Sequence, residues 1–281
     1  MKHILSNLSS YHPIGIFDSG LGGLTVLKEI RQELPQFDYL YLGDNARAPY
    51  GSRSFETVYA YALECIKHLF EMGCELIILA CNTASAKALR NIQQKDLPAM
   101  GGGKRVLGVI RPTTEIIGKY SKTGHVGVLG TSGTVTSASY LVEIEKFFPA
   151  LKVYQEACPM WVPLIENNEY DNAGADFFIK KHVQNLLHQQ SKIDAIILGC
   201  THYPLIIKQI KKHLPENVQL LSQGTIVAKG LKNYLQRHPE MEKKCSKSGT
   251  ASFYTTDLPA TFDVAATLFY GEAISSNHLV L

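Results

Sequence analysis

The sequence predicts an α/β protein made of two pseudo-symmetric, doubly wound parallel-sheet domains that face each other across a cleft. Short β-branched or aliphatic runs alternate with longer segments of helical periodicity, and Gly, Pro, Ser or Asn marks nearly every change between them. The order also repeats, because runs that begin at residues 14, 39, 76 and 106 have counterparts at 125, 152, 195 and 218. The offset between counterparts stays within 111 to 119 residues, which indicates an internal duplication.

The first half begins with a strand, a loop and a helix. The run Ile14–Phe17 meets a glycine-rich turn, after which apolar residues recur at helical spacing from Leu24 to Leu34. A second helix is expected over residues 55–69, and a third from about Thr83. The remaining strands of this half are expected at Tyr39–Leu42, Leu76–Ala80 and Val106–Ile110.

The second half repeats this plan and is followed by a returning segment. Its strands are expected at His125–Leu129, Lys152–Gln155, Ala195–Leu198 and Val218–Leu221. A helix after residue 224, a strand at Ser252–Thr255 and a helix at Leu258–Tyr270 are expected to return to the first half. We therefore expect residues 1–110 with 224–281 to form a discontinuous first domain, and residues 111–223 to form the second.

Composition excludes several classes of function. The chain has 281 residues with 28 basic and 25 acidic side chains, and its net charge of +3 is not concentrated, so nucleic acid is not an expected partner. The longest apolar runs, such as Leu76–Cys81, are far shorter than the roughly 20 residues of a membrane span. Residues Met1–Ser10 lack the continuous apolar core of a secretory signal. A cytoplasmic location without a membrane partner is expected.

Two of the six cysteines occupy equivalent places in the duplication. The third strand of each half runs into a cysteine, as Ala80-Cys81-Asn82-Thr83 and as Gly199-Cys200-Thr201-His202. No Cys-x-x-Cys pair is present, so no metal site is expected. The other four thiols are interpreted as bystanders or as structural: Cys65, Cys74, Cys158 and Cys245.

The position of Cys81 and Cys200 indicates acid–base chemistry. Ligands of open parallel sheets bind outside the carboxyl ends of the strands, and a following helix N-terminus is expected to lower the thiol pKa. Two thiols that approach one ligand from opposite sides are what stereoinversion needs, because one group removes a proton and the other returns one. The alternative for either residue is a buried packing thiol.

The sequence contains no cofactor signature. Gly20, Gly22 and Gly23 do not complete a dinucleotide fingerprint, since Thr25 stands at its third glycine position, and no phosphate-binding loop with a glycine-lysine pair appears. A reaction without cofactors is therefore expected. Substrate carboxylates would be bound by hydroxyl and amide groups, although capping explains Thr131 and Thr134 equally well: the candidates are Ser19, Asn82, Thr83, Thr131, Thr134 and Thr201.

An ordered set of motifs resembles the glutamate racemases, within the cofactor-independent aspartate and glutamate racemase superfamily. The motifs include Ile14-Gly15-Ile16-Phe17-Asp18-Ser19-Gly20-Leu21-Gly22-Gly23, Pro49-Tyr50-Gly51, Ala80-Cys81-Asn82-Thr83, Cys158-Pro159, Val162-Pro163-Leu164-Ile165-Glu166 and Gly199-Cys200-Thr201-His202-Tyr203-Pro204. The resemblance implies a two-domain fold, a homodimer and production of D-glutamate for peptidoglycan. Two stretches depart from it: Leu221-Ser222-Gln223-Gly224, where an Asp-Ser pair is more usual, and the glycine-rich insertion Gly101-Gly102-Gly103-Lys104.

The resemblance also implies roles for individual residues. Cys81 and Cys200 are the two acid–base thiols. Asp18 is expected to pair with the substrate ammonium or to tune Cys81, with a helix cap as its alternative role. His202 is expected to share a proton with the Cys200 thiol or to orient it. Glu166 is the expected partner of His202. The implied substrate-binding residues are Asp18, Ser19, Tyr50, Gly51, Asn82, Thr83, Thr201 and His202.

Three alternatives remain open at this point. The first is a racemase of the same superfamily that acts on aspartate or a hydantoin in place of glutamate. A cysteine hydrolase would use Cys200 as nucleophile and His202 as base, which leaves Cys81 without a role. A two-lobed binding protein would bind a ligand without turning it over.

Overall fold

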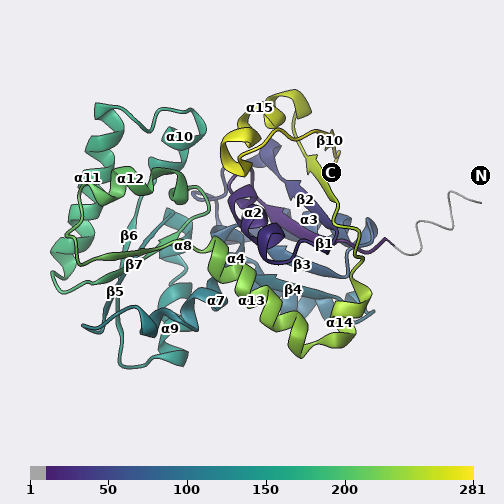
Figure 1. Ribbon diagram of the computed structural model, residues 1–281, viewed down its shortest axis with the longest axis horizontal. Coiled ribbons are helices and arrows are strands. Elements are labelled where there is room, and N and C mark those ends of the chain that lie inside the picture. The colour runs from purple at the N-terminus through teal and green to yellow at the C-terminus, as the bar shows by residue number, and fades with distance from the viewer. Residues whose placement is uncertain (1–10) are drawn as a thin grey trace, which may run out of the picture.

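The computed structural model describes residues 11–281, and residues 1–10, for which a secretory signal was not expected, lie outside the described part. Two lobes lie side by side, each built around one sheet with helices on its faces (Figure 1). All strand pairs in both sheets are parallel. This confirms the predicted fold class.

The first lobe contains a six-stranded sheet in the order β10-β9-β2-β1-β3-β4. Its strands are β1 (Ile14–Asp18), β2 (Tyr39–Gly43), β3 (Leu76–Leu79), β4 (Arg105–Gly108), β9 (Ala251–Thr255) and β10 (Ser276–His278). Its principal helices are α2 (Gly23–Glu33), α3 (Phe55–Glu71), α4 (Asn82–Lys87), α5 (Leu89–Asn91), α6 (Leu97–Met100), α13 (Gly224–Arg237), α14 (Pro239–Lys244) and α15 (Pro259–Tyr270). The central strands are buried on both faces, as continuous apolar runs in a parallel sheet require.

The second lobe contains a four-stranded sheet in the order β6-β5-β7-β8. Its strands are β5 (His125–Gly130), β6 (Lys152–Ala157), β7 (Ala195–Gly199) and β8 (Gln219–Leu221). The helices of this part of the chain are α7 (Ile110–Thr114), α8 (Ser132–Thr136), α9 (Ser139–Phe147), α10 (Trp161–Glu166), α11 (Ala173–Gln189) and α12 (Ile207–Lys211).

The two sheets repeat one strand order. The series β2-β1-β3-β4 corresponds to β6-β5-β7-β8 when each strand is matched to its counterpart about 111 to 119 residues later in the chain. Strands β9 and β10 come after the second sheet in sequence but extend the first, since β9 pairs with β2. Equivalent strand ends of the two sheets therefore carry equivalent residues, including the two cysteines.

Most predicted strands end within two residues of the observed ones, and two elements near residues 83–110 differ in a way that packing explains. The strand expected at Val106–Ile110 ends at Gly108, because its neighbour β3 ends at Leu79, which is the register partner of Gly108. The helix expected from Thr83 is interrupted: α4 and α5 are followed by a π-helix over Ile92–Asp96 and then by α6. The glycines that follow have φ between 63° and 72°, a left-handed conformation that favours glycine. None of the helices described is long and apolar enough to cross a bilayer.

Candidate active site

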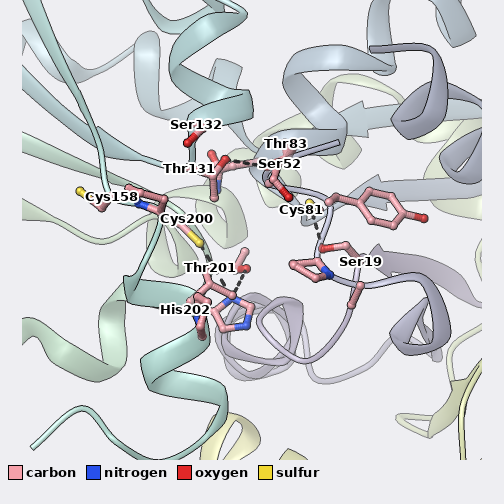
Figure 2. A pocket seen from close by; sticks show the side chains of 18 of the residues that line it. Ser19, Ser52, Cys81, Thr83, Thr131, Ser132, Cys158, Cys200, Thr201 and His202 are labelled. Carbon is pink, nitrogen blue, oxygen red and sulfur yellow. Dashed lines mark hydrogen bonds between the residues drawn. The ribbon is translucent and has the colours of Figure 1, made fainter. Parts of the chain in front are cut away.

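Cys81 and Cys200 lie at the carboxyl ends of equivalent strands and line one cavity. Cys81 follows β3 and caps the N-terminus of α4, whereas Cys200 follows β7. Both residues are 6% exposed, and the cavity between them has a volume of about 160 Å³. Figure 2 shows the two side chains on opposite sides of this cavity. The pair therefore meets the geometric requirement of a two-thiol site, namely one shared cavity.

The cavity lies between the lobes, and each lobe contributes part of its wall. Polar side chains from both lobes converge on it, with Ser52, Thr83, Thr131 and Ser132 on one side and Thr201 and His202 on the other (Figure 2). Of the residues predicted for the site, Asp18 and Thr134 do not line the cavity, and the others do: Ser19, Tyr50, Gly51, Cys81, Asn82, Thr83, Thr131, Glu166, Cys200, Thr201 and His202.

Hydrogen bonds join the lobes on both sides of the cavity. The Gly133 N–H of α8 donates to the Gly51 carbonyl at 2.7 Å. The hydroxyls of Thr83 and Thr131 are 2.9 Å apart. On the opposite side of the cavity, the Thr25 hydroxyl donates to the Thr201 carbonyl at 3.0 Å. These contacts fix the width of the cavity, so both thiols are held at a defined separation.

The surroundings of Cys81 favour its protonated form. Its sulfur lies 3.3 Å from the Ser19 hydroxyl and accepts the Ala84 N–H at 3.4 Å. Burial raises the thiol pKa to about 12, and the charge of Asp18 acts in the same direction. The predicted lowering of this pKa by the helix N-terminus is therefore wrong, because α4 has only six residues and burial outweighs its backbone N–H groups.

Cys200 lies next to a histidine–glutamate pair. Its sulfur is 3.8 Å from Nδ1 of His202, whose Nε2 is 2.9 Å from Oε1 of Glu166. Burial alone lowers the pKa of His202, but hydrogen bonds to Cys200 and Glu166 raise it more, to about 10. The raised pKa favours the imidazolium form of the ring, which lies next to the Cys200 sulfur. The expected role of Glu166 behind His202 agrees with this contact.

The Glu166→Gln variant is expected to lower the pKa of His202 from about 10, because a neutral amide stabilises the imidazolium less than a carboxylate does. Because the pKa of His202 is raised from 6.5 to about 10, the imidazolium is fully present below pH 6.5. It is lost as the pH rises through the pKa of about 10 in the folded protein. In the variant this loss occurs at lower pH. An NMR titration of the His202 ring, with the pH profile of kcat/KM, measures the change.

A second histidine–glutamate pair in the same lobe supplies the control. Glu156 Oε1 lies 2.7 Å from Nδ1 of His182, and neither residue lines the cavity. The Glu156→Gln variant should leave the His202 titration where it is in the unmodified protein. A His202 titration that is the same in Glu166→Gln and in the unmodified protein would contradict the assigned pairing.

Asp18 lies beneath the cavity wall. Its carboxylate is fully buried, Oδ2 accepts the Gly20 N–H at 3.0 Å, and Oδ1 has no hydrogen-bond partner among residues 11–281. Burial raises the pKa of this carboxyl group above its ordinary value. Its charge raises the pKa of the Cys81 thiol further.

Tyr50 lines the cavity. Its hydroxyl donates to Asp44, a fully buried carboxylate that also accepts bonds from Arg47 at 2.7 Å and from Thr256 at 2.8 Å. The hydroxyl is thus engaged away from a ligand. The Asp44 cluster holds the loop that carries Gly51 in place at the cavity.

Cys158 also lines the cavity, which its interpretation as a structural residue did not anticipate. It follows β6, so its position at a strand's carboxyl end was the signal that could have identified it. Its S–H donates to the Glu156 carbonyl at 3.7 Å, and burial raises its pKa well above the ordinary value. The remaining cavity residues that sequence reasoning did not assign are mainly apolar: Ala48, Pro49, Ser52, Ser132, Pro159, Val162 and Pro163.

The other three cysteines are buried away from the cavity. Cys65, Cys74 and Cys245 do not line it, and all six cysteines of the described chain are free thiols. In residues 11–281, no cluster of three or more His, Cys, Asp or Glu side chains is arranged to hold a metal ion.

The fold and the paired thiols together define a class of protein. Residues 15–230 match the model of the Asp/Glu/Hydantoin racemase family. A glutamate racemase from Geobacter metallireducens is 40% identical over 259 residues, which cover 92% of each chain. This chain therefore belongs to the glutamate racemases of that family.

Solved structures of similar proteins share the whole fold. A glutamate racemase isoform from Bacillus anthracis superposes with a TM-score of 0.87 at 35% identity, over 97% of this chain and 98% of the other. The glutamate racemase from Francisella tularensis, solved in complex with D-glutamate, gives a TM-score of 0.84 at 32% identity with the same coverage. The likeness extends over both lobes.

Proposed function

We propose that this protein is a cofactor-independent glutamate racemase that interconverts L-glutamate and D-glutamate and supplies D-glutamate for peptidoglycan. The observation that carries the proposal is the pair of thiols at equivalent strand ends, on opposite sides of one cavity. Membership of the glutamate racemase family supports glutamate as the substrate.

The reaction is a two-base proton transfer at Cα. The thiolate of one cysteine takes the α-proton on one face, and the thiol of the other gives its proton to the opposite face, so each turnover exchanges the charge states of the two sulfurs. A protonated Cys81 is arranged to donate, while Cys200 beside the His202 cation is arranged to accept. The reverse reaction uses the same groups in exchanged roles.

The cavity residues divide into two groups under this proposal. Asp18, His202 and Glu166 adjust the charge around the two thiols. The hydroxyl, amide and backbone groups that bind the substrate are those of Ser19, Tyr50, Gly51, Asn82, Thr83, Thr201 and His202. Charge-assisted hydrogen bonds from these groups to the carboxylates stabilise a substrate whose α-carbon gains negative charge during proton removal.

The proposal extends to location, assembly and domain division. We propose a cytoplasmic homodimer whose protomers each have a domain of residues 1–110 with 224–281 and a domain of residues 111–223. The return of β9 and β10 to the first sheet supports the discontinuous first domain.

Incubation of the purified protein with L-glutamate in deuterium oxide, with no cofactor added, tests the function. We expect the circular dichroism of the solution to fall to zero as the racemate forms, with one deuterium entering at Cα of each product molecule. Absence of turnover with either glutamate enantiomer would overturn the proposal.

The alternatives predict different results in the same assay. Turnover of aspartate or a hydantoin in preference to glutamate would indicate a related racemase with another substrate. An acyl-enzyme trapped on Cys200 from an ester would indicate a hydrolase, for which the contact of Cys200 with His202 supplies a nucleophile and a base. Tight glutamate binding without exchange at Cα would indicate a binding protein.

A further inference from the structure

Gln223 lies outside the cavity wall but is joined to it. This residue belongs to the stretch Leu221-Ser222-Gln223-Gly224, which departs from the family pattern, and it immediately precedes α13. It is 4% exposed, so its amide must find partners inside the protein. Those partners come from three helical segments at the junction of the lobes, where α7 contacts α4, α9 and α13.

The hydrogen-bond partners of Gln223 fix which way its side-chain amide is oriented. Its Nε2 donates to the Val109 carbonyl at 3.1 Å, which can only accept, so the nitrogen of this amide must face Val109. Oε1 then faces Asn82 and accepts from Nδ2 at 2.7 Å. Nε2 also donates to the Tyr140 hydroxyl at 2.8 Å and reaches the Thr113 hydroxyl at 3.2 Å.

The same chain of bonds sets the orientation of the Asn82 amide. Because Tyr140 accepts from Gln223, its own proton is available to Oδ1 of Asn82, 2.7 Å away. Burial raises the pKa of Tyr140, which keeps that proton in place. Asn82 thus has its oxygen against Tyr140 and its nitrogen against Gln223, and exchanging the two would leave mismatched groups on both sides.

One donor of Asn82 remains. An amide nitrogen carries two hydrogens, one of which bonds Gln223, and no second acceptor for Nδ2 lies among residues 11–281. Asn82 lines the cavity and is otherwise 2% exposed. The second hydrogen of Nδ2 is therefore a donor that the Asn82 side chain can offer a bound molecule.

We propose that Gln223 is a positioning residue that, together with Tyr140, fixes the Asn82 amide so that it presents an N–H donor to a substrate carboxylate. The identity of that carboxylate as one from glutamate rests on the proposed function. Because the Val109 carbonyl can only accept a hydrogen bond, it sets the orientation of the Gln223 amide. The Gln223 amide in turn sets the orientation of the Asn82 amide. An ammonium group is disfavoured directly against this N–H, because a donor would face a donor.

Kinetics of Gln223→Met test the proposal, since methionine keeps the length of the side chain but cannot hold Asn82. We expect KM for glutamate to rise about 10-fold, the cost of one hydrogen bond to a charged group, while kcat stays within about 2-fold. Tyr140→Phe removes the other support and should act in the same direction. Gln93→Met is the matched control, because Gln93 also donates to a main-chain carbonyl, at 2.8 Å, but lies away from the cavity.

A double-mutant cycle separates positioning from a purely structural role. If Gln223 acts through Asn82, then Gln223→Met should leave KM unchanged, within about 2-fold, when Asn82 is already alanine. A further 10-fold rise in that background would overturn the proposal, as would an unchanged KM in Gln223→Met alone. A melting temperature for each variant identifies any that fails to fold, and Tyr140→Phe then serves as the second test in the same cycle.

A substrate-free measurement keeps the inference independent of the proposed function. The side-chain NH₂ resonances of Asn82, assigned by their loss in Asn82→Ala, should show slowed hydrogen exchange in the unmodified protein and faster exchange in Gln223→Met. Equal exchange in the two proteins would contradict the fixed amide even if glutamate is racemised. Slowed exchange together with absence of racemisation would contradict the proposed function alone.

Discussion

Cys81→Ser and Cys200→Ser are each expected to lose racemisation by about 10³-fold, within the range that a positioned acid or base contributes. A serine hydroxyl is a much weaker acid than a thiol and does not take up the α-proton as readily. Each variant keeps one functional thiol, on one side of the cavity. The remaining thiol can still exchange the proton of the enantiomer that faces it.

Exchange of the α-proton with deuterium oxide distinguishes the two variants. One should exchange mainly L-glutamate and the other mainly D-glutamate, and alanine in place of either cysteine should abolish racemisation. Cys245→Ala is the matched control, because this thiol is buried to a similar degree but does not line the cavity. If both serine variants racemise at the rate of the unmodified protein, the two-thiol mechanism is wrong.

Gly22→Ala is expected to reduce kcat by about 10²-fold although no catalytic group is removed. A methyl group at this position would lie 2.2 Å from the Thr201 hydroxyl oxygen and 2.4 Å from Nδ1 of His202. The Thr201 and His202 side chains, or the loop that carries them and Cys200, must therefore move away from α2. A displacement of about 1 Å at a reacting group costs on the order of 10²-fold in rate. Steady-state kinetics with both enantiomers measure the loss.

Gly20→Ala is the control for that substitution. Gly20 lies in the same turn, but the nearest atom to an added methyl is Nδ2 of Asn45 at 3.6 Å, an ordinary van der Waals distance. Its activity should stay within a few-fold of the unmodified protein. A Gly22→Ala variant as active as Gly20→Ala would show that the position of the Thr201–His202 loop does not limit catalysis.

Sequence patterns predicted the fold because they record which residues are buried together. Continuous apolar runs such as Leu76–Leu79 require a strand covered on both faces, and the constant offset to a second set of runs indicated the repeat. Both cysteines could be placed at strand ends for the same reason. The strand β10 was missed because Ser276–His278 is short and polar, without apolar alternation.

The electrostatics of the site could not be predicted in the same way. A helix N-terminus after Cys81 suggested a lowered pKa, but burial outweighs it, and the charges of Asp18 and Cys200, both far away in the sequence, act in the same direction as burial. The role of Gln223 was equally hidden, since its partner Asn82 is 141 positions away. Local patterns identify which residue types are present, whereas the dielectric and the bonding around them are set by tertiary packing.

The unequal surroundings of the two thiols have a kinetic consequence. Cys81 lies beside Ser19 and above Asp18, whereas Cys200 lies beside a histidine–glutamate pair, so the duplicated halves are not equivalent in charge. Enantiomers have identical free energies in water, and no catalyst changes that equality. The Haldane relation therefore requires equal kcat/KM for the two directions, and any bias towards faster turnover of one antipode must be matched by a proportionally larger KM for it.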